Sequence, residues 1–465
     1  MMLLPDSAAA CVKRLENAGF ATYAVGGCVR DACLGLTPHV YVLCTAATPA
    51  VMKAIFADHT LVLAGEKHGT VGVVMDGEVV EITTFRTEGD YRDNRHPDRV
   101  EFVTDIEKDL SRRDFTVNAM ADSPTRGLCD PFGGREDLKK GILRAVGDAE
   151  TRFREDSLRI LRGVRFAVRF RLTPEEKTEK AMAELAGLME NLTRERVFSE
   201  LDGLLPHLRA EDLIRYSTVL CAVIPELRAT LGFDQRTHHH IYDIYTHTAQ
   251  VVAGVPATSV LRWAALLHDI GKPACFTLDE AGCGHFYGHA KVSAQLAKDV
   301  LLRLKAPTAL RSRVERLIEL HMTPLAADKK LLRRRVAQHG FETVYDLLRL
   351  QESDVKGTGV TENALSFAGV EDILKEIEAE NACLTLKDLA ISGHDLMALG
   401  FSGPAIGKTQ RYLLEQVLEE RLPNEKEALL RAAKNLYRGE SYETCIFDRF
   451  GLLRHRTDAG QRGLW

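Results

Sequence analysis

Histidines and aspartates in the middle third of the chain have the types and the order of ligands for divalent metals. They are His247, the adjacent pair His268 and Asp269, and then His289, His321 and Asp354. Imidazole nitrogens and carboxylate oxygens together suit Mn²⁺, Fe²⁺, Co²⁺ or Ni²⁺, and an adjacent His-Asp pair brings two ligands to one ion. The whole set is large enough for two ions, an arrangement that serves phosphoester hydrolysis. For His289 or His321 taken alone, the alternative to a metal ligand is an ordinary surface or core histidine at a helix end.

Two glycines near the N-terminus and two later arginines suit the binding of a polyphosphate. Gly26 and Gly27 follow a short apolar segment and let the backbone approach a ligand closely, with Arg30 within reach of a phosphate. Arg112 and Arg113 form a pair of guanidinium groups that can bind several phosphate oxygens. A Gly-Gly turn after a strand is, by itself, more typical of a plain tight turn.

The segment from Glu155 to Arg159 combines carboxylates and a guanidinium at helical spacing. Arg159 lies three residues after Asp156 and four after Glu155, which predicts that these groups share one helix face. A donor fork and an acceptor on one helix face can form paired hydrogen bonds with the polar edge of a ligand. A salt-bridge network on the surface of a basic helix is the alternative.

The elements that must position these residues change in type along the chain. The pattern predicts a helix at 7–19 capped by Asp6 or Ser7, strands at 21–25, 71–75, 79–83 and 100–103, and a hairpin turn at Asp76-Gly77. Beyond Asp148, helical periodicity continues to the C-terminus. The expected fold class is therefore α+β, an N-terminal α/β head followed by an all-α neck, body and tail.

Taken together, these segments resemble the class II nucleotidyltransferases, the family of bacterial CCA-adding enzymes and poly(A) polymerases. The resemblance covers essentially the whole chain, and its motifs include Gly26-Gly27, 109–119 and 155–166. It implies a polymerase-beta-like head at 1–145, a base-selecting and RNA-binding neck at 146–236, a helical domain at 237–360 and a tRNA-binding tail at 361–465. It also implies CTP and ATP as substrates, Mg²⁺ as cofactor and the tRNA 3′ acceptor end as partner. The nucleotide-binding residues that it implies are Gly26, Gly27, Arg30, Arg112, Arg113, Asp114, Asn118, Glu155, Asp156, Arg159, Arg162 and Arg165.

The chain departs from this family at the position of its metal-binding carboxylates. The family pattern after Pro38-His39 is Asp-x-Asp on a strand, but this chain has Val40 and Val42. Valine cannot bind a hard cation, although it is a strong strand former that leaves the sheet undisturbed. Glu81 is the residual carboxylate of the expected catalytic set. The sequence therefore predicts that nucleotidyl transfer is abolished or severely impaired.

The ordered histidines and aspartates of the body resemble the HD phosphohydrolase superfamily. A related domain accompanies several CCA-adding enzymes, with phosphodiesterase or phosphatase activity in some and a structural role in others. The resemblance implies a metal-dependent phosphohydrolase in which Lys272 holds a substrate phosphate. Such a hydrolase is one alternative function, and an RNA-binding module without chemistry is another. Ordinary CCA addition despite the valines would require a different arrangement of carboxylates.

Basic clusters carry the expectation of RNA binding, because the overall composition does not. The 465 residues have a net charge of −5, with 45% hydrophobic and 27% charged residues. Arginines recur after Asp148, and a second run occupies 329–335, a pattern that suits an A-form RNA backbone. A solvated helix face is the alternative for each cluster. Scattered cysteines, the lack of a signal peptide and the lack of a long apolar run indicate a cytoplasmic protein without a membrane span.

Overall fold

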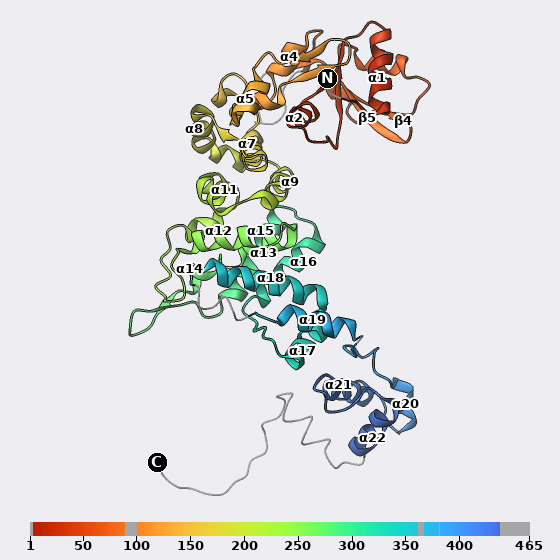
Figure 1. The fold of residues 1–465 in the computed structure, drawn as a ribbon, viewed down its shortest axis with the longest axis vertical. Coiled ribbons are helices and arrows are strands. Elements are labelled where there is room, and N and C mark those ends of the chain that lie inside the picture. The colour runs from red at the N-terminus through yellow and green to blue at the C-terminus, as the bar shows by residue number, and fades with distance from the viewer. Residues whose placement is uncertain (1–2, 89–99, 361–366, 381, 438–465) are drawn as a thin grey trace. The chain divides into compact units, whose positions relative to one another are not determined.

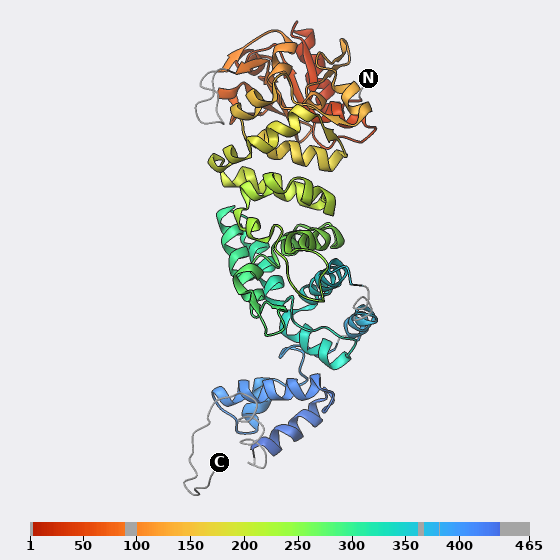
Figure 2. The same ribbon diagram turned by 90° about the vertical axis from the view of Figure 1, so that its left-hand side faces the viewer.

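The computed structural model describes residues 3–88, 100–360, 367–380 and 382–437. These residues form two compact units, 1–319 with 356–359 and 320–355 with 360–465 (Figure 1). The N-terminal head contains a mixed sheet, and the later parts consist of helices and loops with a few very short strands (Figure 2). The expected α+β fold class is confirmed.

The head is built around one sheet of seven strands in the order β3-β4-β5-β2-β1-β8-β9. Strand β1 (Thr22–Val25) pairs antiparallel with β2 (Val42–Thr45) and with β8 (Ala121–Ser123), while β2 pairs parallel with β5 (Glu78–Thr84). The predicted hairpin between β4 (Thr70–Met75) and β5 is confirmed. The other elements of the head are α1 (Asp6–Asn17), α2 (Gly27–Cys33), α3 (Pro49–Ile55), β3 (Leu61–Val62), β6 (Arg86–Glu88), β7 (Val100–Phe102), α4 (Ile106–Ser111), β9 (Gly127–Cys129) and α5 (Gly134–Lys140).

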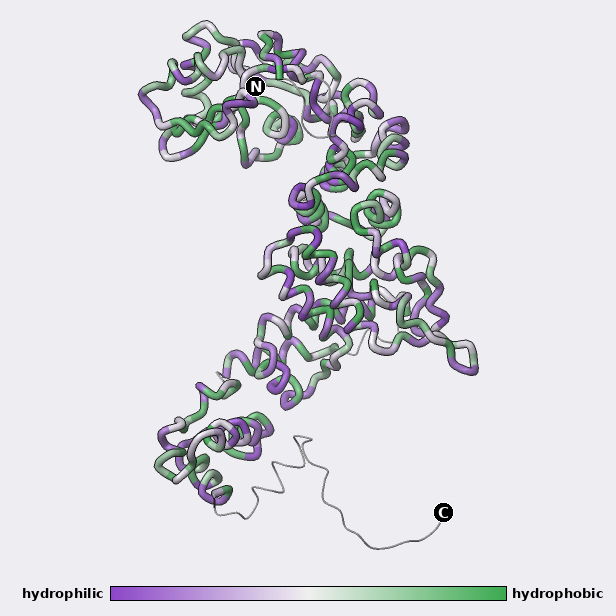
Figure 3. The backbone as a smooth tube through the Cα atoms, turned by 180° about the vertical axis from the view of Figure 1, so that it is seen from behind, coloured by the Kyte–Doolittle hydropathy of each residue, from purple (hydrophilic) through white to green (hydrophobic). Residues whose placement is uncertain are grey.

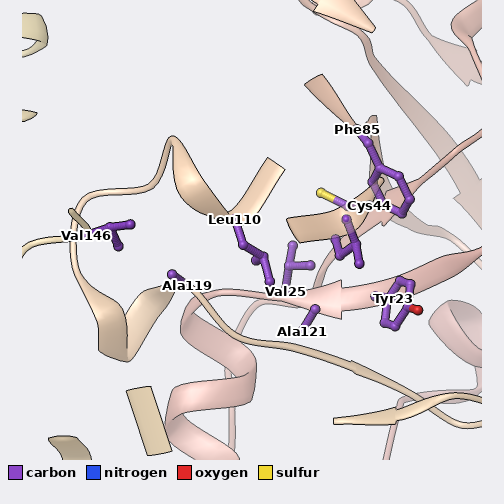
Figure 4. Packing of buried hydrophobic residues seen from close by; sticks show 9 residues of the cluster. Tyr23, Val25, Cys44, Phe85, Leu110, Ala119, Ala121 and Val146 are labelled. Atoms are coloured by element: carbon purple, nitrogen blue, oxygen red, sulfur yellow. The ribbon is translucent and has the colours of Figure 1, made fainter. Parts of the chain in front are cut away.

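One apolar core lies against the centre of this sheet and holds the strands that carry the candidate site. Figure 4 shows Tyr23 and Val25 of β1, Cys44 of β2, and Leu110 of α4 pointing into it. Val42, at the start of β2, packs against the same core and is half-buried. Burial raises the pKa of the Cys44 thiol to about 12, so this side chain is neutral and acts as a small apolar group. The core therefore sets the position of the first residue of β2.

Helices follow the head in the first unit. They and the short strands between them are β10 (Ile142–Leu143), α6 (Ala149–Glu155), α7 (Leu158–Phe170), β11 (Thr173–Pro174), α8 (Glu176–Glu184), α9 (Arg194–Leu204), α10 (Ala210–Arg215), α11 (Ser217–Val223), α12 (Ile244–Gly254), α13 (Ser259–Leu267), α14 (Lys272–Cys275), β12 (Thr277–Leu278), β13 (Gly284–His285), α15 (His289–Arg303) and α16 (Thr308–Leu320). Helix α13 is buried almost throughout, which makes it a rigid support for the residues that follow it.

The second unit contains two groups of helices. Its elements are α17 (Lys329–His339), α18 (Phe341–Gly357), α19 (Val370–Ala379), α20 (Gly393–Ala398), α21 (Pro404–Leu418) and α22 (Lys426–Tyr437). The last three share an apolar core that includes Leu396, Phe401 and Leu413. Helix α17 buries only Leu332 and Val336, and ion pairs join it to its neighbours.

Some local predictions were wrong. Helix α1 begins at Asp6 with Pro5 as its N-cap, so no side chain caps it. The predicted strand at 100–103 is present as β7, but it pairs with β6 in a separate two-stranded sheet and does not join the sheet of seven strands. Apolar and polar stretches alternate along the helices (Figure 3), and no helix among the described residues is long and apolar enough to cross a bilayer.

Candidate functional site

The double glycine forms the sharp turn between β1 and α2. Gly26 has φ 75° and ψ −124°, a conformation that favours glycine. A Cβ atom at this position would lie 2.8 Å from Nη1 of Arg113, so a side chain here would push that guanidinium away from the turn. The structure therefore brings the glycine turn and the second arginine of the pair together, as a phosphate site requires.

Asp109 holds the two arginines of this pair. Its carboxylate is fully buried and lies 2.9 Å from Nη2 of Arg112 and 3.3 Å from Nη2 of Arg113. The backbone N–H of Arg86 also donates to it, at 3.2 Å. Burial opposes ionisation, but the charges of Arg112 and Arg113 outweigh it and lower the pKa of Asp109. This buried anion orients both guanidinium groups, and the sequence analysis did not single it out.

Arg30 points into the protein. It is 6% exposed, and it donates to Oδ1 of Asn118 at 2.6 Å and to Oδ1 of Asp31 at 2.7 Å. Its guanidinium lies 4.2 Å from the ring centroid of Phe170 and 5.2 Å from that of Phe166. The predicted reach to a phosphate does not match this position, because the side chain is used to join α2 to α7.

A chain of buried charges continues from Asn118 to the helices after the head. Asp114 accepts a hydrogen bond from Nδ2 of Asn118 at 3.1 Å and forms an ion pair of 2.8 Å with Arg162. Burial opposes the ionisation of Asp114, but the charge of Arg162 and the hydrogen bond from Asn118 lower its pKa. Glu200 of α9 then lies 3.5 Å from Arg162 and 2.5 Å from Arg165. Four of the residues implied by the resemblance are thus tied together, and Glu200 completes the chain.

The predicted single helix through Glu155 and Arg159 is wrong. Helix α6 ends at Glu155, Asp156 is extended with φ −136° and ψ 101°, and α7 begins after Ser157. Arg159 still reaches Glu155 at 2.8 Å, and it also donates to the carbonyl oxygen of Arg112 at 3.0 Å. Asp156 instead pairs with Arg196 of α9 at 2.8 Å. The acceptor and the donor fork therefore sit at a junction of two helices, each held by a different partner.

The positions of the missing carboxylates lie at the edge of this site. Val40 precedes β2 and is 70% exposed, so the prediction that both valines lie on a strand is wrong for this residue. Val42 opens the strand and stands in register with Glu81 of β5. Mg²⁺ needs oxygen ligands in octahedral geometry, and two isopropyl groups beside one carboxylate do not supply them. The residues present therefore do not fit the metal that the family pattern requires.

A second cluster lies among α12, α13 and α15 of the first unit. Oδ2 of Asp269 lies 3.4 Å from Nε2 of His247, 3.3 Å from Nε2 of His268 and 2.7 Å from Nζ of Lys272. Oδ1 of Asp269 lies 3.3 Å from Nε2 of His289. All five side chains are buried.

Backbone carbonyls orient two of these imidazoles. Nδ1 of His268 lies 2.8 Å from the oxygen of Ala265, and Nδ1 of His289 lies 2.8 Å from that of Phe286. A proton on each Nδ1 leaves the lone pair on Nε2, directed at Asp269, which is how metal-ligating histidines are usually held. The cluster therefore fits a divalent transition metal.

The remaining predicted ligands belong to the second unit. His321 follows α16, and its carbonyl oxygen accepts from Nε2 of Gln351 at 2.7 Å. Asp354 lies on α18 and is half-buried. Their role as ligands stays a prediction. In the first unit, His240 packs edge-on against His247 with 4.7 Å between ring centroids, although the predicted ligand set does not include it.

The family models that match the chain and its similar relatives point to the same family. Residues 22–144 match the family model of the poly A polymerase head domain, and residues 282–433 match that of tRNA nucleotidyltransferase domain 2. The CCA-adding enzyme of Lactiplantibacillus plantarum is 32% identical over 434 residues, covering 91% of this chain and 94% of that protein. The CCA-adding enzyme of Limosilactobacillus fermentum is 34% identical over 434 residues, covering 91% and 95%. The chain belongs to the CCA-adding enzyme family.

The solved structures of this family share the fold. The crystal structure of the Bacillus stearothermophilus CCA-adding enzyme in complex with CTP has a TM-score of 0.72 and 27% identity, covering 94% of this chain and 98% of that one. The Thermotoga maritima CCA-adding enzyme in its tRNA complex has a TM-score of 0.54 at 21% identity, which supports the fold alone.

The CCA-adding enzyme fold explains which site residues the sequence analysis missed. Arg196 and Glu200 both come from α9, and they hold Asp156 and the pair Arg162 and Arg165 respectively. Their spacing of four residues places them on one helix face. That spacing was available in the sequence, but nothing there showed that this face meets α7.

Proposed function

We propose that this member of the CCA-adding enzyme family recognises a tRNA acceptor end, CTP and ATP, while its nucleotidyl transfer is abolished or severely impaired. The single observation that carries the proposal is the pair Val40 and Val42, which stand where the family pattern has two aspartates, with Val42 in register with Glu81. The glycine turn beside Arg113 and the arginine pair held by Asp109 support the recognition part of the proposal. Relatives named CCA-adding enzymes, one of them in complex with CTP, support the choice of substrates.

In this proposal the described residues bind and orient the nucleotide. Arg112 and Arg113, aligned by Asp109, receive the triphosphate beside Gly26. Asp156 and Arg159 present an acceptor and a donor fork to the base. Six residues are positioning residues, because their contacts join the glycine turn to the helix junction: Arg30, Asn118, Asp114, Arg162, Arg165 and Glu155. The proposed domains are the head at 1–145, the neck at 146–236, a body at 237–360 and a tRNA-binding tail at 361–465.

Loss of the metal carboxylates affects the chemical step more than binding. Positioning and metal electrostatics supply most of the catalysis of phosphoryl transfer, and removing one such part costs about 10³–10⁵-fold in rate. The free-energy barrier to nucleotidyl transfer is therefore raised by about 4–7 kcal/mol, because each tenfold loss of rate corresponds to about 1.4 kcal/mol. Glu81 is a single carboxylate and does not replace the pair.

Binding without transfer is the first expected result. The purified chain should retain labelled CTP and a tRNA that lacks its 3′ CCA on a filter, but should add no labelled C or A with Mg²⁺ present. Asp156→Asn keeps the shape of the side chain and removes its charge, so it should weaken CTP retention without altering tRNA retention. Robust addition by the unmodified chain would overturn the proposal.

A second candidate function rests on the cluster around Asp269. Three imidazoles and one carboxylate converge in the first unit, with two of the imidazoles oriented by carbonyl groups. A divalent transition metal bound there supplies Lewis-acid activation for hydrolysis of a phosphoester. Lys272, paired with Asp269 and with Gln235, is placed to orient an anionic substrate.

Metal binding tests this candidate independently of activity. Calorimetric titration with Mn²⁺ should show binding to the unmodified chain. The Mn²⁺ affinity should fall at least tenfold in His268→Ala, because this variant lacks one imidazole ligand. Hydrolysis of bis(p-nitrophenyl) phosphate should disappear in the same variant. His68→Ala, which removes an exposed histidine of the head, is the matched control and should change neither measurement. Equal Mn²⁺ binding by all three proteins would contradict a metal centre here.

A further inference from the structure

The hairpin formed by β12 and β13 gathers a third set of possible ligands, outside both sites described above. Asp279, Cys283 and His285 each offer one donor atom, and these atoms lie within 4.8 Å of one another. Asp279 is exposed, while Cys283 and His285 are half-buried. Neither the triphosphate site nor the cluster around Asp269 uses any of them.

The turn of this hairpin orients the carboxylate. Oδ1 of Asp279 accepts from the backbone N–H groups of Ala281 at 3.0 Å and of Cys283 at 2.9 Å. The N–H of Asp279 in turn donates to the carbonyl of Cys283 at 3.0 Å. These bonds direct Oδ2 toward Nε2 of His285, at 2.9 Å. The carboxylate thus has one oxygen engaged by the backbone and the other facing the imidazole.

Tyr287 supports the imidazole from its other side. Its ring stacks on that of His285 with 5.3 Å between centroids and an interplanar angle of 7°. Its hydroxyl lies 3.4 Å from Nδ1 of His285. A polar partner on the nitrogen that does not face the other donors is the usual companion of a metal-ligating histidine. Tyr287 is 79% exposed, so the packing of the core does not impose this contact.

We propose that Asp279, Cys283 and His285 bind a zinc ion. A thiolate and a carboxylate together carry two negative charges, which match Zn²⁺, and thiolate, imidazole and carboxylate are its three preferred protein ligands. Three protein ligands leave one tetrahedral position open to solvent. The softness of the thiolate distinguishes this site from the cluster around Asp269, whose ligands are nitrogen and oxygen only.

Zinc at this position would stabilise a segment that is otherwise weakly held. Strands β12 and β13 pair over only two residues each, and an isolated two-stranded hairpin is marginally stable. The hairpin is anchored at its base, where the N–H of Gly284 donates to the carbonyl oxygen of Arg236 at 2.8 Å. A metal ion that joins both arms adds its binding free energy to the stability of the folded hairpin.

Cobalt substitution in the full-length chain tests the site. Titration with Co²⁺ should produce a near-ultraviolet thiolate-to-cobalt charge-transfer band that saturates and is abolished by added Zn²⁺. The band should be absent in Cys283→Ser, which removes only the thiolate at an accessible position, and should persist in the control Cys275→Ser. The cluster around Asp269 contains no thiolate and cannot produce this band.

The contact between the Tyr287 hydroxyl and His285 allows a second test of the site. Tyr287→Phe removes the hydroxyl but keeps the stacked ring, so Co²⁺ affinity should fall about tenfold with an unchanged band shape. A band that survives in Cys283→Ser, or no thiolate band at saturating Co²⁺ in the unmodified chain, would overturn the proposal. Unchanged Co²⁺ affinity in Tyr287→Phe would contradict the proposed role of His285 as a ligand held by Tyr287.

Discussion

Replacing both valines with aspartate should raise CTP and ATP addition by at least about 10³-fold. The Val40→Asp/Val42→Asp variant restores both carboxylates of the family pattern, and the one at position 42 stands in register with Glu81. The remaining parts of the site are present in the unmodified chain, including the glycine turn with Arg113 and the pair of arginines held by Asp109. The measurement is incorporation of radiolabelled CTP and ATP into tRNA that lacks its 3′ CCA, with Mg²⁺.

Val40→Asn/Val42→Asn is the matched control for this gain of function. Asparagine has nearly the shape of aspartate but no charge, so this variant should remain inactive. The aspartate variant should also lose stability without Mg²⁺, by about 1–2 kcal/mol, because a charged residue replaces a strand former against the core and faces Glu81. Added Mg²⁺ should restore its melting temperature but not that of the asparagine variant. No gain of addition despite that Mg²⁺-dependent recovery would mean that more than the two carboxylates is missing.

Asp109→Asn should destabilise the protein by about 3 kcal/mol, the lower part of the range for breaking a buried ion pair. The substitution leaves two guanidinium groups next to an uncharged amide in a fully buried position. The side chains of Arg112 and Arg113 are each 18% exposed, so water partly solvates their charges and limits the loss of stability. CTP retention should fall as well, since Arg112 and Arg113 lose their common partner. Urea denaturation followed by circular dichroism gives the free energy of unfolding.

An exposed pair supplies the control for this second prediction. Glu136 and Lys140 form an ion pair of 3.4 Å on the surface of α5, with more than half of each side chain exposed. Glu136→Gln should therefore change the free energy of unfolding by no more than about 0.5 kcal/mol. Equal losses in the two variants would contradict a special role for the buried carboxylate.

Acid should remove the contribution of Asp109 in a defined direction. The pKa of Asp109 is lowered in the folded protein, so its contribution to stability is present above the ordinary carboxyl pKa of about 3.9. It is lost as the pH falls below that value and through the lower pKa of the folded state. The Asp109→Asn variant lacks this titration, and its stability should therefore decline less steeply over the same acid range.

The success of the sequence analysis depended on how local each signal was. The hairpin at Asp76-Gly77 was predictable because two residues with positive φ, 50° and 84°, are required there and the sequence supplies both. The break after Glu155 was not predictable, because the spacing of Arg159 also suits an unbroken helix. Arg30 was misread because its burial depends on Phe166 and Phe170, which lie far along the chain. Glu200 was missed for the same reason, since its partners Arg162 and Arg165 come from α7. Asp109 was missed although its partners follow it by three and four residues, because its burial is set by the fold.

The ion pairs of α17 have a consequence for how nucleic acid approaches the second unit. Lys329 pairs with Glu376 and Glu380, and Arg333 pairs with Glu380 and Glu420. Arg334 likewise pairs with Glu419. The predicted basic cluster at 329–335 therefore projects little net field into solvent, because each of these cations has an anion within a few ångströms. Long-range electrostatic steering of a phosphate backbone must then arise from other parts of the surface, and α17 contributes cohesion between helices.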